Sequence, residues 1–243
     1  MIPSAAGVVT ALRPESRSLT RHSRAPVSGN TRVMVSGIGR ENAYRAACRL
    51  VDDGARALVS WGCAGALSSE LAAGDLCLPG TILSVDGMGL DVDTGWRDRV
   101  QRALGSGFHV RTAPLLGSDR LAVAPAYKAE LARRFANAIA VDMESAGVAT
   151  AATERGVPFL VVRAIVDTRA VTLPPSVIRA VESKGGVRLP RMLAHALMHP
   201  RELPAHFALA AGFGAALATL RRAARLLGAG LAFEDPPAIG IGH

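Results

Sequence analysis

AVDMESAGVA at residues 140–149 and VVRAIVD at residues 161–167 are the segments from which the fold class is first inferred. The first segment carries two carboxylates, Asp142 and Glu144. The second is an apolar run, typical of a buried strand, that ends on a third carboxylate, Asp167. In α/β proteins, ligands usually bind at the carboxyl ends of such strands. These acidic side chains are therefore the first candidates for a functional site.

Strands and helices alternate outward from these two segments. Apolar residues at helical spacing predict a helix over 42–53, closed by Gly54, and another over 143–155. Strands are predicted over residues 6–12, 32–36, 57–61, 75–78, 81–85, 138–141 and 159–166. Repeated strand–turn–helix units of this kind favour an α/β sheet with helices on both faces.

Composition narrows the class of protein. The chain has 243 residues, is 49% hydrophobic, and is long enough to bury one large core. The net charge of +8 comes with no recognised nucleic-acid-binding motif, so no nucleic-acid partner is expected. The three cysteines form no CxxC pair, and the histidines lack partners at metal-ligand spacing, so neither disulfides nor a metal is expected. No secretory leader is recognised, and a cytoplasmic location is expected.

Two glycine-rich segments follow predicted strands. SGIGR at 36–40 would let the backbone approach a ligand closely and would offer helix N-terminal amides to an anion. GCAGAL at 62–67 is predicted as a second turn of the same kind. The candidate phosphate-binding residues are Gly37, Gly39, Arg40, Gly62 and Cys63. The alternative is that these glycines serve turn geometry alone.

The carboxylates suggest a role in binding and cleaving a nucleoside. Glu144 would accept hydrogen bonds from two vicinal ribose hydroxyls, with Met143 packing against the sugar. The alternative is structural: Asp142 would cap the following helix, and Glu144 would complement the helix dipole. Asp167, desolvated among apolar neighbours, would be a general acid that protonates a leaving purine at N7. Its alternative is a turn or cap aspartate before Thr168.

Taken in order, SGIGR, GCAGAL with GDLCLP (74–79), VDMESAGVA and FLVVRAIVD (159–167) resemble the nucleoside phosphorylase/nucleosidase family. The similarity is greatest to the methylthioadenosine/S-adenosylhomocysteine nucleosidases and spans about residues 6–170. It implies a three-layer α/β/α sandwich around a mixed, twisted sheet and a homo-oligomer, with a dimer favoured. It also implies that Asp167 is the acid at N7 and that Glu144 binds the ribose 2′- and 3′-hydroxyls. The other substrate-binding residues expected from it are Met143, Asp142, Leu121, Ala122, Gly65 and Ala64.

The C-terminal part resembles a narrower group. LPPSVIRAV, HPRELPAHFALA and ALATLRRAARLL, between residues 173 and 227, are similar to the tail of hopanoid-associated phosphorylases. This resemblance implies adenine release from 5′-linked adenosylhopane, with inorganic phosphate as co-substrate and no cofactor. The basic stretch 188–225 either rests on a membrane surface as amphipathic helices or packs its apolar stripe on the sheet. The expected organisation is an α/β domain over 1–186, a helical extension over 187–230 and a flexible tail over 231–243.

Departures from the family pattern leave the nucleophile open. The glutamate that directs water in the nucleosidases falls here on Pro14 or, with a one-residue shift, on Glu15. Pro14 would favour phosphorolysis, whereas Glu15 would favour hydrolysis of small 5′-thioadenosines. The serine that precedes the catalytic acid in the nucleosidases is Val166 here, so the residue that orients Asp167 is not identified. Phosphorolysis of an adenosyl hopanoid is the function predicted, with hydrolysis and a non-catalytic membrane-docking protein as alternatives.

Overall fold

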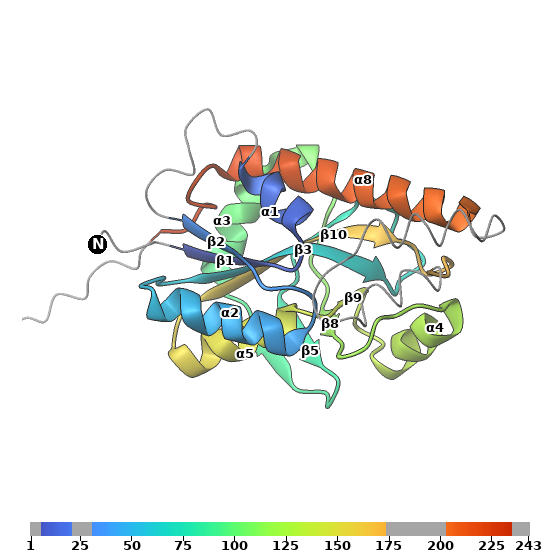
Figure 1. Cartoon of the computed structure of the whole chain (residues 1–243), viewed down its shortest axis with the longest axis horizontal. Helices are drawn as coiled ribbons and strands as arrows, with labels where there is room; N and C mark the ends of the chain where they lie inside the picture. The colour runs from blue at the N-terminus through green and yellow to red at the C-terminus, as the bar shows by residue number, and fades with distance from the viewer. Residues whose placement is uncertain (1–5, 21–30, 174–202, 235–243) are drawn as a thin grey trace, which may run out of the picture.

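Two long apolar runs form the centre of the molecule. The strands β3 (Leu58–Ala66) and β10 (Phe159–Asp167) lie side by side in parallel, with Asp167 opposite Gly65. Nearly every residue in them is buried because both faces of the sheet are covered, which explains why neither run alternates between apolar and polar residues. The computed structural model describes residues 6–20, 31–173 and 203–234 (Figure 1).

The described residues form one mixed sheet of ten strands, with helices between them. The other strands are β1 (Ala6–Thr10), β2 (Thr31–Val35), β4 (Leu76–Cys77), β5 (Thr81–Ser84), β6 (Gly89–Asp91), β7 (Val110–Arg111), β8 (Leu115–Gly117) and β9 (Ala140–Asp142). The helices are α1 (Arg13–Thr20), α2 (Arg40–Asp52), α3 (Thr94–Leu104), the short 3₁₀ helix η1 (Gly105–Gly107), α4 (Pro125–Arg134), α5 (Ser145–Arg155) and α8 (Leu203–Leu227).

The sheet branches at β3. The main path runs β6-β5-β8-β9-β3-β10-β4-β7, and β1 pairs with β3 and with β2 beside it. β1 pairs with the first half of β3, whereas the antiparallel β9 pairs with its last two residues. The carboxyl ends of β3 and β10 therefore meet the end of β9, where the acidic segment leaves the sheet.

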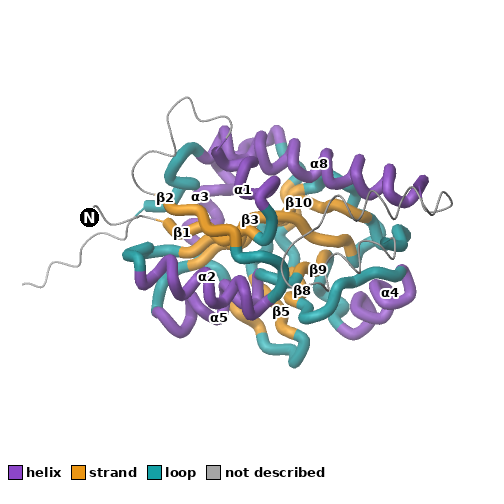
Figure 2. Tube along the Cα trace, in the orientation of Figure 1, coloured by secondary structure: helices purple, strands orange, loops and turns teal. Residues whose placement is uncertain are grey.

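Helices cover both faces and give three layers (Figures 1 and 2). α2 and α5 pack on one face, and α1, α3 and α8 pack on the other. Alternate residues of β10 divide between the two cores: Val161 and Ile165 face α2 and α5, while Leu160 and Val162 face the opposite layer. The α/β/α sandwich around a mixed sheet that the sequence predicted is confirmed.

Most predicted elements are present within two residues of their predicted bounds, but the second glycine turn is wrong. β3 does not end at residue 61; it continues through Ala66, so GCAGAL is mostly strand. The glycines lie there because side chains of neighbouring elements press on the strand. A Cβ at Gly62 would lie 2.6 Å from Arg163 Nη1, and one at Gly65 would lie 3.2 Å from Asp167 Oδ1.

The C-terminal segment packs on the sheet. The apolar stripe of α8, which includes Ala216, Leu220 and Ala223, is buried against the β10 layer. This agrees with the packing alternative for the part of 188–225 that is described; residues 188–202 lie outside the described residues. No described helix combines the length and hydropathy needed to cross a membrane.

The predicted flexible tail is wrong at its start. Leu231 is buried, and its carbonyl accepts a hydrogen bond from Trp96 Nε1 at 2.8 Å. The ring of Phe233 meets Trp96 edge-on, with centroids 4.9 Å apart. Residues 231–233 therefore pack with the core beside α3, Glu234 is exposed, and residues 235–243 lie outside the described residues.

Candidate active site

A buried arginine organises the acidic side chains. Arg163, on β10, is 1% exposed, and its Nε donates to Asp142 Oδ2 at 2.6 Å. Its Nη2 donates to the hydroxyls of Ser60 at 2.7 Å and Ser145 at 3.1 Å. A buried guanidinium requires such partners because its charge has been removed from water. Sequence analysis missed Arg163, although an arginine inside an otherwise apolar strand was a visible signal.

Asp142 has a structural role in this arrangement. Besides its bonds to Arg163, it accepts from the Ser145 amide at 3.1 Å and from the Ser145 hydroxyl at 2.5 Å. Its side chain is 1% exposed, so no acceptor is left for a substrate. Its bond to the amide of Ser145, the first residue of α5, agrees with the helix-capping alternative, and substrate binding by Asp142 stays a prediction.

Glu144 links the acidic segment to the first glycine turn. Its Oε1 accepts the Gly39 amide at 2.9 Å, and its Oε2 lies 3.9 Å from Arg163 Nη2. Burial is the largest cause that raises the Glu144 pKa to about 7, and the neighbouring Asp142 adds to it. Arg163 and the Gly39 amide lower the pKa in opposition. The carboxylate is thus poised to change charge near neutral pH.

Gly147 allows α5 to approach α2 closely enough for Glu144 to reach the Gly39 amide. A Cβ at Gly147 would overlap the carbonyl oxygen of Arg40, so only glycine lets α5 approach the start of α2 this closely. Gly37 and Gly39 both have positive φ, 83° and 106°, which agrees with the predicted tight turn. The Gly39 amide, however, is already bonded to Glu144 and is not free for the predicted phosphate.

Glu15 lies near Arg163 beside Gly62. It belongs to the first turn of α1, is 3% exposed, and accepts the amides of Leu12 at 2.8 Å and Cys63 at 2.9 Å. Its pKa is raised chiefly by burial and is lowered in part by Arg163. Gly62 lacks a side chain because Arg163 and Glu15 occupy that space. The Cys63 amide, one of the predicted phosphate contacts, is thus already bonded to Glu15, whereas the predicted contact at Gly62 stays a prediction.

Asp167 ends β10 beside a buried lysine. It is 8% exposed, and its Oδ2 accepts a hydrogen bond from Lys128 Nζ. Burial is the largest cause that raises the Asp167 pKa, and Lys128 acts in the opposite direction. The register between β10 and β3 shifts just before Asp167, which turns its carboxylate over Gly65.

Comparison with known proteins identifies the family of this chain. A family model described as phosphorylase superfamily matches residues 25–197. The chain belongs to the phosphorylase superfamily. The predicted enzyme class, a nucleoside phosphorylase or nucleosidase, is confirmed at this level. No curated protein matches the chain.

Several solved structures share the fold of this superfamily member. The 5′-methylthioadenosine/S-adenosylhomocysteine nucleosidase of Neisseria meningitidis is 18% identical with a TM-score of 0.70, covering 92% of this chain and 98% of its own. The corresponding nucleosidase from S. pneumoniae is 18% identical with a TM-score of 0.68, and the match covers 94% of this chain and 98% of the nucleosidase. Futalosine hydrolase of Helicobacter pylori is 17% identical with a TM-score of 0.68, covering 94% and 97%.

The remaining predicted residues of this phosphorylase-superfamily site are differently placed. Ala64 packs in the core under α2 and α5, and Ala122 packs in the small core under α4, so neither side chain is free to bind substrate. Leu121 and Met143 are half-buried. The Leu121 loop is nevertheless tied to the segment after Asp167, because the Leu173 amide donates to the Val123 carbonyl at 2.8 Å.

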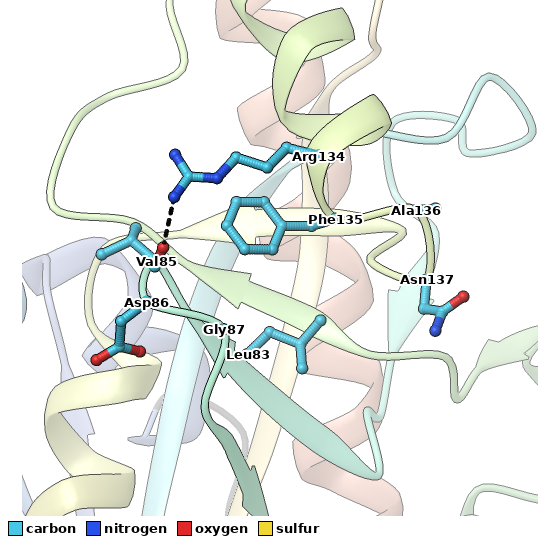
Figure 3. Close-up of a pocket in the computed structure, with 8 residues that line it drawn as sticks. All are labelled: Leu83, Val85, Asp86, Gly87, Arg134, Phe135, Ala136 and Asn137. Atoms are coloured by element: carbon cyan, nitrogen blue, oxygen red, sulfur yellow. Dashed lines mark hydrogen bonds between the residues drawn. The ribbon is translucent and has the colours of Figure 1, made fainter.

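Two cavities accompany the site. One of about 330 Å³ lies beside Asp167 and is almost wholly apolar; its walls include Val166, Val171 and the α8 residues Leu209 and Gly212. The other, of about 350 Å³, lies between the β5–β6 turn and the end of α4 (Figure 3). There Arg134 donates to the Val85 carbonyl at 3.2 Å. Only the first cavity contains one of the predicted catalytic residues.

Proposed function

We propose that this enzyme cleaves the N-glycosidic bond of an adenosine-type nucleoside by hydrolysis, with Glu15 directing the water. The observation that carries the proposal is the buried carboxylate of Glu15, packed with Arg163 over Gly62. The amides of Gly39 and Cys63, two of the expected phosphate contacts, are both engaged by carboxylates. Carboxylates repel a phosphate dianion, whereas a carboxylate of raised pKa is a suitable general base for water.

The remaining steps follow from the positions of two other acids. Asp167 donates its proton to purine N7 as the C1′–N9 bond breaks, and the bonding electrons leave with the base. Water attacks C1′, and its proton passes to Glu15. Glu144 accepts hydrogen bonds from the ribose 2′- and 3′-hydroxyls, and its negative charge favours the cationic sugar in the transition state. Free adenine and a ribosyl product with a 1-hydroxyl result.

Phosphorolysis of 5′-linked adenosylhopane is the second candidate. Its support is the resemblance of the tail motifs together with the apolar cavity beside Asp167, about 330 Å³ in volume and walled partly by α8. Such a cavity would suit an apolar group of a lipid-linked substrate. The nucleophile would then be phosphate at the start of α2, near Arg40.

Adenine release with and without phosphate separates the two candidates. Methylthioadenosine and a 5′-alkyl adenosine are the substrates, and the sugar product is identified. We expect a free ribosyl product to be released without phosphate. In Glu15→Gln the rate of this release should fall by about 10²–10⁴-fold. The matched control is Glu154→Gln, an exposed carboxylate on α5. Phosphate-dependent formation of the 5-substituted ribose 1-phosphate would reject hydrolysis, and full activity of Asp167→Asn would reject the mechanism altogether.

A further inference from the structure

Lys128 is the one buried ammonium group among the described residues. It lies on α4 and is fully buried, far from the surface that lysines normally occupy. Its Nζ donates to Asp167 Oδ2, to the Thr168 carbonyl at 2.8 Å and to the Val171 carbonyl at 3.3 Å. An ammonium has three N–H donors, and each has an acceptor here.

We propose that Lys128 is the positioning residue of the catalytic acid: it orients the Asp167 carboxyl and sets its affinity for the proton. The inference rests on the proposed function, in which Asp167 donates to the leaving base. Val166, directly before the acid, has no hydroxyl that could orient it. The lysine supplies that restraint from another element and ties the acid to the turn that follows it.

The surroundings of Asp167 leave Lys128 as the dominant charge. From β3 it faces Gly65, which has no side chain. From α8 the adjoining cavity presents alanine, leucine and glycine. The carboxylates Glu15 and Glu144 face Arg163 in the neighbouring cluster instead. Among the residues that the structure describes, Lys128 is therefore the main charge that acts on the acid.

Proton donation by Asp167 requires that the charge of Lys128 oppose the effect of burial on this carboxyl. Proton transfer from Asp167 to the base leaves a buried carboxylate, which would be costly without a cation beside it. Lys128 stabilises that product state and so makes Asp167 a stronger acid than burial alone would allow. The residue type is informative as well: Lys128 and Lys184 are the only lysines among the 28 basic residues of the chain. A single nitrogen with three converging donors fits these acceptors, whereas the flat guanidinium of arginine does not.

Lys128→Gln tests the proposal because the amide still donates to the backbone carbonyls but carries no charge. The falling limb of the pH profile of kcat/KM, which reports loss of the proton from the acid, should move to higher pH by about one unit or more. The kcat should fall by about tenfold or more, while KM changes by less than about threefold. Lys128→Arg keeps the charge but cannot meet all three acceptors, so it should move the falling limb less than Lys128→Gln does.

The results for Lys128→Gln and Asp167→Asn together decide whether Lys128 positions the catalytic acid. A folded Lys128→Gln enzyme with an unchanged falling limb overturns the inference, whereas an inactive Asp167→Asn beside it leaves the proposed function standing. An active Asp167→Asn would instead remove the proposed function. If Lys128→Gln is unfolded at neutral pH, the inference requires that it refold at lower pH, where Asp167 is neutral, and that Lys128→Gln/Asp167→Asn fold at neutral pH. A protein that stays unfolded in both tests shows Lys128 to be purely structural.

Discussion

Replacing Glu144 by glutamine should make the protein more stable at neutral and alkaline pH while reducing its activity. The side chain is 7% exposed, its one direct hydrogen bond comes from the Gly39 amide, and Arg163 lies 3.9 Å away. Burial, with the help of Asp142, raises the Glu144 pKa from 4.5 to about 7. The folded protein thus binds a proton at this residue more tightly than the unfolded chain does.

The sign and size of the effect follow from linkage. A carboxyl whose folded pKa is raised destabilises the folded state progressively as pH rises from 4.5 to about 7, and by a constant amount above that. Each unit of pKa difference corresponds to about 1.4 kcal/mol, so the wild-type protein should lose roughly 3 kcal/mol across this window. Glutamine can still accept from the Gly39 amide but does not titrate, and its variant should escape this loss.

Urea unfolding of both proteins at half-unit steps between pH 4.5 and pH 8 measures the difference. The free energy of unfolding of Glu144→Gln minus that of the wild type should rise by about 3 kcal/mol over the window and then level off. Glu154→Gln removes an exposed carboxylate outside the buried cluster and serves as the control variant. A flat or falling curve for Glu144→Gln would refute the reasoning. Its kcat/KM for a nucleoside should fall by about 10²-fold or more, because a ribose acceptor is lost.

Two further predictions concern residues that hold the site together. In Gly212→Ala the new methyl group would overlap the Val166 carbonyl, so we expect a loss of about 1–3 kcal/mol and a drop in kcat as the end of β10 shifts. The control Gly214→Ala meets nothing within 4 Å and should gain up to about 1 kcal/mol from helix propensity; urea unfolding and steady-state kinetics distinguish the two. Arg163→Lys keeps the charge but cannot reach Asp142, Ser60 and Ser145 together, so we expect a loss of about 3–5 kcal/mol in urea unfolding. Wild-type stability of Arg163→Lys would show that the hydrogen-bonded cluster is not needed.

The sequence predicted the layers well because buried parallel strands and their covering helices have strong local signals. The runs that became β3 and β10 are mostly apolar, and Gly54 follows α2 with positive φ as predicted. The failure at GCAGAL has a physical cause. Glycines after an apolar run are typical of a turn. Here they remain in the strand because side chains from other elements occupy the space that a Cβ would fill.

The site was predicted less completely because its organising charges come from distant parts of the chain. Asp167 and Glu144 were found from their own surroundings. Arg163 was signalled by its place in an apolar strand, but its partners, like those of Lys128, lie on other elements and cannot be inferred from local patterns. Glu15 could not be separated from Pro14 along the sequence, yet in the structure its carboxylate lies against Arg163, whereas a proline could not make that contact.

The balance of charge around Arg163 bears directly on the nucleophile. Three buried carboxylates, Glu15, Asp142 and Glu144, share this one guanidinium, and Asp142 already pairs with it. Burial raises the pKa values of both Glu15 and Glu144, and Arg163 lowers them only in part because it also pairs with Asp142. A phosphate bound between them would add further negative charge and make the site less stable still. Water adds none, and on attacking C1′ it releases a proton that Glu15 is prepared to accept. This deficit of positive charge supports the proposed hydrolysis, and it would also stabilise a cationic sugar as the bond to the base breaks.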